Sequence, residues 1–209
     1  MLRCTCPFGR WSKTRRFGYH RCRWILSYLV MQIDLESLKY PIGKFSIPQE
    51  IDSEMIKKAV TRISDFPSNI FQVASSLTPA QLDSPYRPGG WTVRQLLHHC
   101  ADSHGQALFR FKHALTEENP TIKPYDEGSW ANLPDAALPA AYALDMLRLV
   151  HAKWLHLLQN MSPADFERTY YHPEKQRSQT LAEVTLMYAW HGEHHLAHIS
   201  GLIQRNFDR

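Results

Sequence analysis

Residues 181–205 read LAEVTLMYAWHGEHHLAHISGLIQR. Thr180 and Glu183 stand three residues apart at the start of this stretch, in the capping-box pattern that begins a helix. We therefore expect one helix from Leu181 to about Arg205. Four histidines of the chain fall within eight residues of this helix, and this local density is the strongest chemical signal in the sequence.

The four histidines take two directions around the predicted helix. At roughly 100° per residue, His191, His195 and His198 lie within about 60° of one another, and His194 lies about 60° to one side. Apolar residues border the first three, so this face is expected to point into the protein (Met187, Trp190 and Ile199). Several imidazoles buried without a partner would be costly to desolvate, which favours a shared cation. Side chains at i and i+4, such as His191 and His195, can reach one ion.

The segment around Glu193 resembles the metalloprotease motif H-E-x-x-H but differs from it in one respect. Its acid follows His191 by two residues instead of one. Glu193 then lies about 200° around the helix from His191, away from the ion. We therefore do not assign Glu193 as a general base.

Three further helices are predicted upstream. Apolar residues spaced by three and four predict the first from Pro48 to Leu77, with a kink or break near Phe66 because Pro67 has no amide hydrogen. The second is expected from about residue 91 to before residue 120, and the third from about residue 140 to 161. Turn residues and prolines predict loops at 83–90, 119–139 and 170–180. Four long helices with long connections describe an all-α four-helix bundle.

A third metal ligand can come from the second predicted helix, which offers His98 and His99. Helical periodicity alone does not choose between them. Three protein ligands with an open position are typical of a catalytic zinc-type site, because the vacant place holds a water whose pKa the ion lowers to about 7.

The other histidines of the body are expected to have lesser roles. Supporting or packing roles are predicted for three of them (His104, His194 and His198). By geometry His198 could replace His195. Ordinary surface or core roles are predicted for the rest (His113, His151, His156 and His172).

The basic charge of the chain is concentrated at its beginning. The whole chain carries a formal charge of +4, but residues 1–30 hold seven Lys and Arg and no acidic residue. Residues 31–209 are left with 17 basic and 20 acidic side chains, a net charge of −3. A basic face that neutralises phosphates is therefore not expected, which argues against nucleic-acid binding. No run of about 20 apolar residues is present, so a membrane span is not expected either.

Residues 1–30 are predicted to be an extension outside the folded domain, which we place at residues 31–209. They mix Cys, Pro and Gly with Arg and aromatic residues, without helical or strand periodicity. We expect a disordered segment or an artefact of gene-start assignment, with translation beginning at Met31. An export signal is not favoured, because no small-residue cleavage site follows the apolar run. Only Cys100 lies in the body, so no internal disulfide can form there and a reducing, cytoplasmic location is expected.

The body of the chain carries distinctive motifs over about residues 40 to 205. They are YPIG at 40–43, PYRPGGWTVRQ at 85–95, HHCADSH at 98–104, PYDE at 124–127 and WHGEHHLAHI at 190–199. Together they resemble the YfiT group of the DinB superfamily. The resemblance implies an up-down-down-up bundle, usually a homodimer, with one divalent metal ion per chain, zinc or nickel. It also implies that the metal ligands are His99, His191 and His195, which selects His99 over His98.

The resemblance implies a metal-dependent hydrolase, in which an ion held by three histidines activates water for attack on a small-molecule substrate. An S-transferase is the alternative, in which the ion lowers the pKa of a low-molecular-weight thiol such as bacillithiol. Several side chains are candidates for its thiol pocket (Arg94, Asp102, Arg110, Lys112, and Tyr125 and Trp130 of the 119–139 loop). A non-enzymatic, dimeric metal-binding module is the third alternative, and it predicts a closed site with a fourth ligand such as His198. No catalytic residue is assigned.

Overall fold

The computed structural model describes residues 35–206. The predicted extension at residues 1–30 and the predicted start at Met31 lie outside the described residues. The described residues from Ser37 onward belong to one compact unit.

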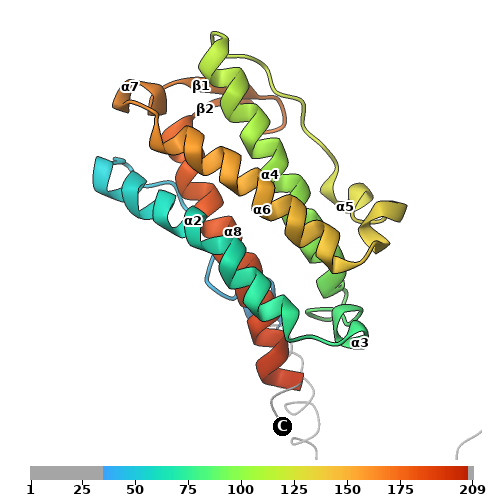
Figure 1. Cartoon of the computed structure of the whole chain (residues 1–209). Helices are drawn as coiled ribbons and strands as arrows, with labels where there is room; N and C mark the ends of the chain where they lie inside the picture. Colours follow the sequence, from blue (N-terminus) through green and yellow to red (C-terminus); the bar gives the residue numbers. More distant parts are fainter. Residues whose placement is uncertain (1–34, 207–209) are drawn as a thin grey trace, which may run out of the picture. The chain divides into compact units, whose positions relative to one another are not determined.

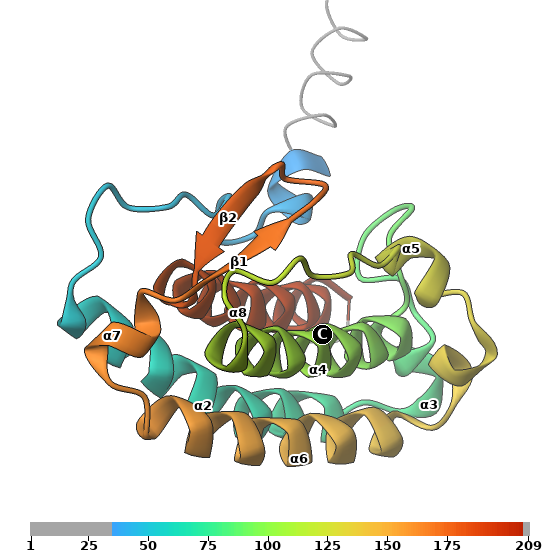
Figure 2. The same cartoon turned by 90° about the horizontal axis from the view of Figure 1, so that it is seen from above.

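Four long helices form the bundle: α2 (Ser53–Ser75), α4 (Val93–Thr116), α6 (Ala140–Gln159) and α8 (Leu181–Asn206). α2 packs against α8 and α6, and α4 packs against the same two helices, so that α2 and α4 stand at opposite corners (Figure 2). α4 and α6 run parallel to each other, while α2 and α8 run in the opposite direction (Figure 1). This is the up-down-down-up order, and the prediction of an all-α four-helix bundle is confirmed.

Short helices lie in the connections between the long ones: α3 (Pro79–Leu82), α5 (Glu127–Trp130), the 3-10 helix η1 (Pro134–Ala137) and α7 (Pro163–Phe166). Because α4 and α6 are parallel, the chain between them must return along the length of the bundle. The segment that contains α5 and η1 makes this return (Figure 1). The long, proline-rich connection predicted from the sequence therefore follows from the topology.

Side-chain caps set where two of the long helices begin. Asp52 accepts a hydrogen bond from the amide of Met55 at 2.7 Å, so α2 starts directly after Asp52 and not at Pro48 as predicted. Thr180 accepts a hydrogen bond from the amide of Glu183 at 3.1 Å. The predicted beginning of α8 is thereby confirmed.

A kink or a break was predicted near Phe66, but the helix α2 continues through Pro67, so a break is wrong. In an α-helix the amide of residue 67 would donate to the carbonyl of Ile63, and proline lacks that amide. The Ile63 carbonyl instead accepts a hydrogen bond from Nδ1 of His151 at 2.9 Å. A neighbouring helix thus satisfies the acceptor that the proline leaves free, which removes one cost of a proline inside a helix.

A β-hairpin stands where a loop was predicted at residues 170–180. Strand β1 (Thr169–His172) pairs antiparallel with β2 (Arg177–Thr180). The amide of Ile122 donates to the carbonyl of Tyr171 at 3.1 Å, so β1 also contacts the connection that leaves α4. The loop prediction failed because strands of four residues carry little periodicity and are stabilised by pairing with distant parts of the chain.

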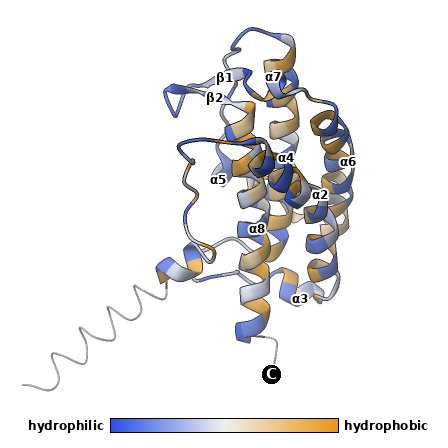
Figure 3. Cartoon of the chain, turned by 90° about the vertical axis from the view of Figure 1, so that its left-hand side faces the viewer, coloured by the Kyte–Doolittle hydropathy of each residue, from blue (hydrophilic) through white to orange (hydrophobic). Residues whose placement is uncertain are grey.

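Apolar side chains fill the space between the long helices. Those completely or almost completely buried come from all four (Ile63, Ile70, Leu96, Phe111, Leu147, Trp154, Ile199 and Leu202). Hydrophobic residues recur between hydrophilic ones along the long helices (Figure 3). This pattern is expected for helices that bury one face in the core and expose the other to solvent. Cys100 lies in this core with a free thiol. Among residues 35–206, no helix is long and apolar enough to cross a bilayer.

Candidate metal centre

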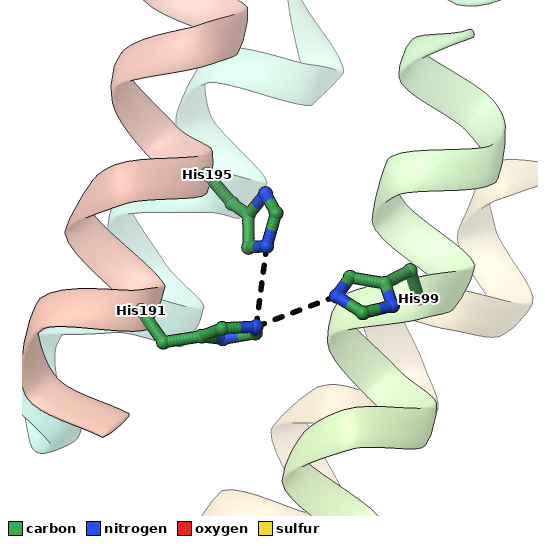
Figure 4. A group of neighbouring side chains, drawn as sticks. All are labelled: His99, His191 and His195. Carbon is green, nitrogen blue, oxygen red and sulfur yellow. Dashed lines mark hydrogen bonds between the residues drawn. The ribbon is translucent and has the colours of Figure 1, made fainter. Parts of the chain in front are cut away.

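Three histidines meet between α4 and α8 (Figure 4). Nε2 of His191 lies 3.3 Å from Nε2 of His99 and 3.2 Å from Nε2 of His195. Zinc–nitrogen bonds of roughly 2.0–2.1 Å in a tetrahedron place neighbouring nitrogens about 3.3–3.4 Å apart, so these separations suit one ion. The structure therefore brings together the three residues that the resemblance implies as ligands. Ligation itself stays a prediction.

The phase of α4 decides which histidine of the HH pair faces α8. Thr92 and Gln95 form a capping box that fixes the beginning of α4 about two turns before His99. His98 turns away, and its Nε2 lies 3.2 Å from the carbonyl oxygen of Leu138. The choice between His98 and His99 that periodicity left open is thus made by the packing of α4 against α8.

Loss of solvent keeps the three imidazoles neutral. Burial, followed by the charge of nearby His194, lowers the pKa of His99 to about 4. Burial, followed by the neighbouring histidines, holds the pKa values of His191 and His195 well below their usual range. Neutral imidazole is the form that binds a metal. The group can therefore offer three nitrogen lone pairs at neutral pH without first losing protons.

Two more buried histidines extend from this group toward α2. Nε2 of His104 lies 3.0 Å from Nδ1 of His191, and Nδ1 of His104 lies 2.7 Å from Nε2 of His151 on α6. A supporting role was predicted for His104, but only an ordinary one for His151, because nothing local in the sequence places α6 beside α4. The available signal was Pro67, which leaves the Ile63 carbonyl in need of a donor.

Gly192 allows α2 and α8 to approach each other beside the histidines. A Cβ atom at this position would lie 3.0 Å from the ring of Phe66. Phe66 in turn stacks on His104, with ring centroids 5.2 Å apart. The adjacent Glu193 forms an ion pair with Arg62 of α2. Glu193 is thus engaged on the side of α8 that faces α2, in agreement with its assignment away from the ion.

A second group of histidines lies on α8. One nitrogen each of His194, His195 and His198 lies within 4.8 Å of the others, and their Nδ1 atoms are buried without a hydrogen-bond partner. Nε2 of His198 lies 3.2 Å from the carbonyl oxygen of Lys39, and the ring of Tyr86 stacks on it at 4.2 Å. Among the described residues, His198 does not join His99 and His191 in one ligand group. This geometry does not favour His198 as a replacement for His195.

A cavity of about 380 Å³ lies beside the histidines. Five histidines contribute to its wall (His99, His191, His194, His195 and His198). Aromatic and cationic side chains line it as well (Tyr40, Tyr86, Trp91, Trp190, Lys39 and Arg87). Glu127 is the only carboxylate among the described residues of this lining. Partial burial, followed by the neighbouring Asp126 carboxylate, raises the pKa of Glu127. The cavity falls within the range of about 300–1,000 Å³ that is usual for small-molecule sites.

The comparison with known proteins identifies the family. The sequence matches the model of the DinB superfamily over residues 62–199. The chain belongs to this superfamily. It is 48% identical over 171 residues to a Bacillus mycoides protein named "Putative metal-dependent hydrolase", a match that covers 82% of this chain and 98% of that protein. A Bacillus pumilus protein of the same name is 46% identical over 172 residues, with the same coverage.

Solved structures place the chain within the superfamily. YfiT from Bacillus subtilis, described as "a probable metal-dependent hydrolase with an unusual four-helix bundle topology", matches with a TM-score of 0.79 and 40% identity. The match covers 81% of this chain and 97% of YfiT. The resemblance to the YfiT group is therefore confirmed. A mycothiol-dependent maleylpyruvate isomerase, with a TM-score of 0.54 and 16% identity over 66% of this chain and 60% of its own, shares the fold alone.

The cavity beside the histidines is not lined by any of the side chains suggested for a thiol pocket (Arg94, Asp102, Arg110, Lys112, Tyr125 and Trp130). Arg94 instead pairs with Asp83 at 2.8 Å and lines a separate cavity of about 690 Å³. From the 119–139 loop, it is Glu127 that reaches the histidines' cavity. Sequence reasoning missed Glu127 because the path of this loop is set by the return between two parallel helices.

Proposed function

We propose that the protein is a metal-dependent hydrolase whose ion is held by His99, His191 and His195. The observation that carries this proposal is the convergence of three neutral imidazoles on the wall of a ligand-sized cavity. The names of relatives at 46–48% identity support the same reaction class. The size of the cavity supports a small-molecule substrate.

The three Nε2 atoms suit a divalent ion of the zinc type, with zinc as the first candidate and nickel as the second. When bound, such an ion polarises a carbonyl or similar group and lowers the pKa of water. Glu127 is proposed as the proton acceptor, because it is the carboxylate of the cavity and its raised pKa lies nearer the neutral range in which a general base works. Arg87 and Lys39 are proposed to hold an anionic part of the substrate.

An S-transferase for a low-molecular-weight thiol is the second candidate. The two cations of the cavity, Lys39 and Arg87, favour it because they suit a thiol that carries a carboxylate. Thiolate attack on an electrophile needs no general base once the thiol is deprotonated. The two reactions therefore differ in their need for Glu127.

Metal content is the first test of the site. Protein purified without an affinity tag is expected to hold about one divalent ion per chain by plasma mass spectrometry. Separate substitutions His99→Ala, His191→Ala and His195→Ala should each abolish it, whereas His113→Ala on the exposed side of α4 should not. Wild-type protein that takes up no ion would refute the proposed centre.

Substitution of Glu127 then separates the reactions. Metal-loaded wild type, Glu127→Gln and the control Glu118→Gln are compared on a panel of esters and amides, and on a thiol with an electrophile. Loss of a general base typically costs about 10²- to 10⁴-fold in rate, so hydrolysis should fall by this factor in Glu127→Gln only. Thiol transfer that persists in Glu127→Gln, without hydrolysis by wild type, would support the transferase instead. No turnover of either kind by the loaded protein would refute an enzymatic function.

A further inference from the structure

A line of buried imidazoles connects the proposed ligand His191 to the backbone of α2. His151 on α6 contacts the carbonyl of Ile63, His104 on α4 contacts His151, and His191 on α8 contacts His104. The three contacts measure 2.9, 2.7 and 3.0 Å, all within hydrogen-bonding range. All four long helices of the bundle therefore take part in one hydrogen-bonded line.

Within the described part of the chain, the two middle rings, those of His104 and His151, have no charged partner. His104 is completely buried and His151 is 3% exposed. Among residues 35–206, neither forms an ion pair with a carboxylate. A buried, uncompensated cation would be costly, so both rings are neutral and each has one N–H donor and one bare nitrogen acceptor.

The carbonyl at the end of the line sets the direction of every hydrogen bond. A carbonyl oxygen can only accept, so Nδ1 of His151 carries the hydrogen and its Nε2 is bare. Nε2 of His151 must then accept from Nδ1 of His104, which leaves Nε2 of His104 bare. That nitrogen accepts in turn from Nδ1 of His191. The remaining nitrogen of His191, Nε2, therefore carries no hydrogen.

Nε2 of His191 is the atom that faces the other two candidate ligands. It is the common partner of Nε2 of His99 and Nε2 of His195, at 3.3 and 3.2 Å. A metal ligand needs a bare nitrogen at this point. The line of imidazoles thus holds His191 in the tautomer that ligation requires.

Pro67 is the origin of the line. In a helix without proline at position 67, the Ile63 carbonyl would accept from the amide of residue 67, and it would then be a weaker partner for a side chain. Because residue 67 is proline, this acceptor is free inside α2 and points to His151. Pro67 of α2 thereby acts on His191 of α8 through His151 and His104.

Aromatic packing resists rotation of the histidine rings. Phe66 stacks on His104 at 5.2 Å, and Tyr188 meets the same ring edge-on at 5.1 Å. Trp154 packs edge-on against both His104 and His151, at 6.0 and 5.9 Å. Ring flips that would exchange the nitrogens are therefore resisted by the core.

We propose that His104 and His151 are positioning residues, which use the carbonyl released by Pro67 to fix the orientation and tautomer of His191 for metal binding. The inference rests on the proposed metal centre and adds residues that do not touch the ion. The inference also gives a role to Pro67, which lies inside α2. Partners of this kind typically change metal affinity by about 10- to 100-fold when they are removed.

The tautomers are measured first, on the full chain in metal-free form, by two-bond ¹H–¹⁵N correlation spectra of the histidine rings. The expected result is a hydrogen on Nδ1 and a bare Nε2 for His151, His104 and His191 alike. A hydrogen on Nε2 of His191 with a bare Nδ1 would overturn the proposal. This measurement needs no variant, so it is independent of any effect of substitution on folding.

Zinc affinity is measured next, by competition with a chromogenic chelator. The expected result for His104→Phe and His151→Phe is about 10- to 100-fold weaker binding than wild type. Matched controls replace exposed histidines on the same two helices, His113→Phe and His156→Phe, and should keep wild-type affinity. A glutamine carries both a donor and an acceptor, so His151→Gln should recover part of the loss.

Pro67→Ala separates positioning from simple stability. It returns an amide that competes for the Ile63 carbonyl, and it removes an unfavourable residue from a helix interior. We expect weaker zinc binding without a lower unfolding midpoint. Folded His104→Phe and Pro67→Ala proteins that bind zinc as tightly as wild type would overturn the proposal. If wild type and all variants alike take up no zinc, the metal centre fails, and the positioning role fails with it.

Discussion

Acid should destabilise the metal-free protein through its buried histidines. The pKa values of His99 and His151 are lowered to about 4, in both cases chiefly by burial, from an ordinary value of 6.5. Between these values the unfolded chain binds protons that the folded chain does not, so stability is complete above about pH 6.5 and is lost as the pH falls toward 4. From pH 7 to pH 5 each of these two groups removes about 2 kcal/mol.

Protonation of His99 and His151 should therefore lower the free energy of unfolding by about 4 kcal/mol when the pH falls from 7 to 5. This is a large part of the roughly 5–15 kcal/mol that is typical of a domain. The assay is urea unfolding with a chelator present, followed by tryptophan fluorescence, to which buried Trp154 contributes. With a slope of about 2–3 kcal/mol per M, the midpoint should fall by about 1.3–2 M. His151→Gln should remove about 2 kcal/mol of this pH dependence, and His156→Gln, on the exposed side of α6, is the matched control. Equal midpoints at pH 7 and pH 5 would refute the reasoning.

Three other outcomes are expected. Gly192→Ala should destabilise the fold by about 1–3 kcal/mol in urea, because the new Cβ would lie 3.0 Å from the ring of Phe66; an unchanged midpoint would show that the close approach of α2 and α8 is not required. Arg62→Ala should change stability by no more than about 1 kcal/mol and leave the metal content intact, since its pair with Glu193 is about two-fifths exposed on both sides. His198→Ala should retain one ion per chain by mass spectrometry while His195→Ala loses it, and loss in both would point to the second histidine group.

Local patterns determined most of the fold and part of the site. The Thr180–Glu183 signal set the start of α8, and the i, i+4 spacing set His191 and His195 on one face, because both depend only on helical geometry. The stretch between α4 and α6 was recognised as a long connection because its prolines and turn residues disfavour a regular helix. Motif resemblance then selected His99, the histidine that the structure brings opposite His191.

These local patterns could not predict the contacts between segments that are distant in the sequence. His151 joins the site only because α6 packs beside α4, and Glu127 reaches the cavity only because the return between parallel helices passes it. The hairpin was missed for a similar reason, since its strands are short and one of them pairs with the loop after α4. Pro67 predicted a disturbance of α2, yet its outcome depended on a donor from another helix. A residue's helical phase is a local property, whereas its partner across the core is fixed only when the helices pack.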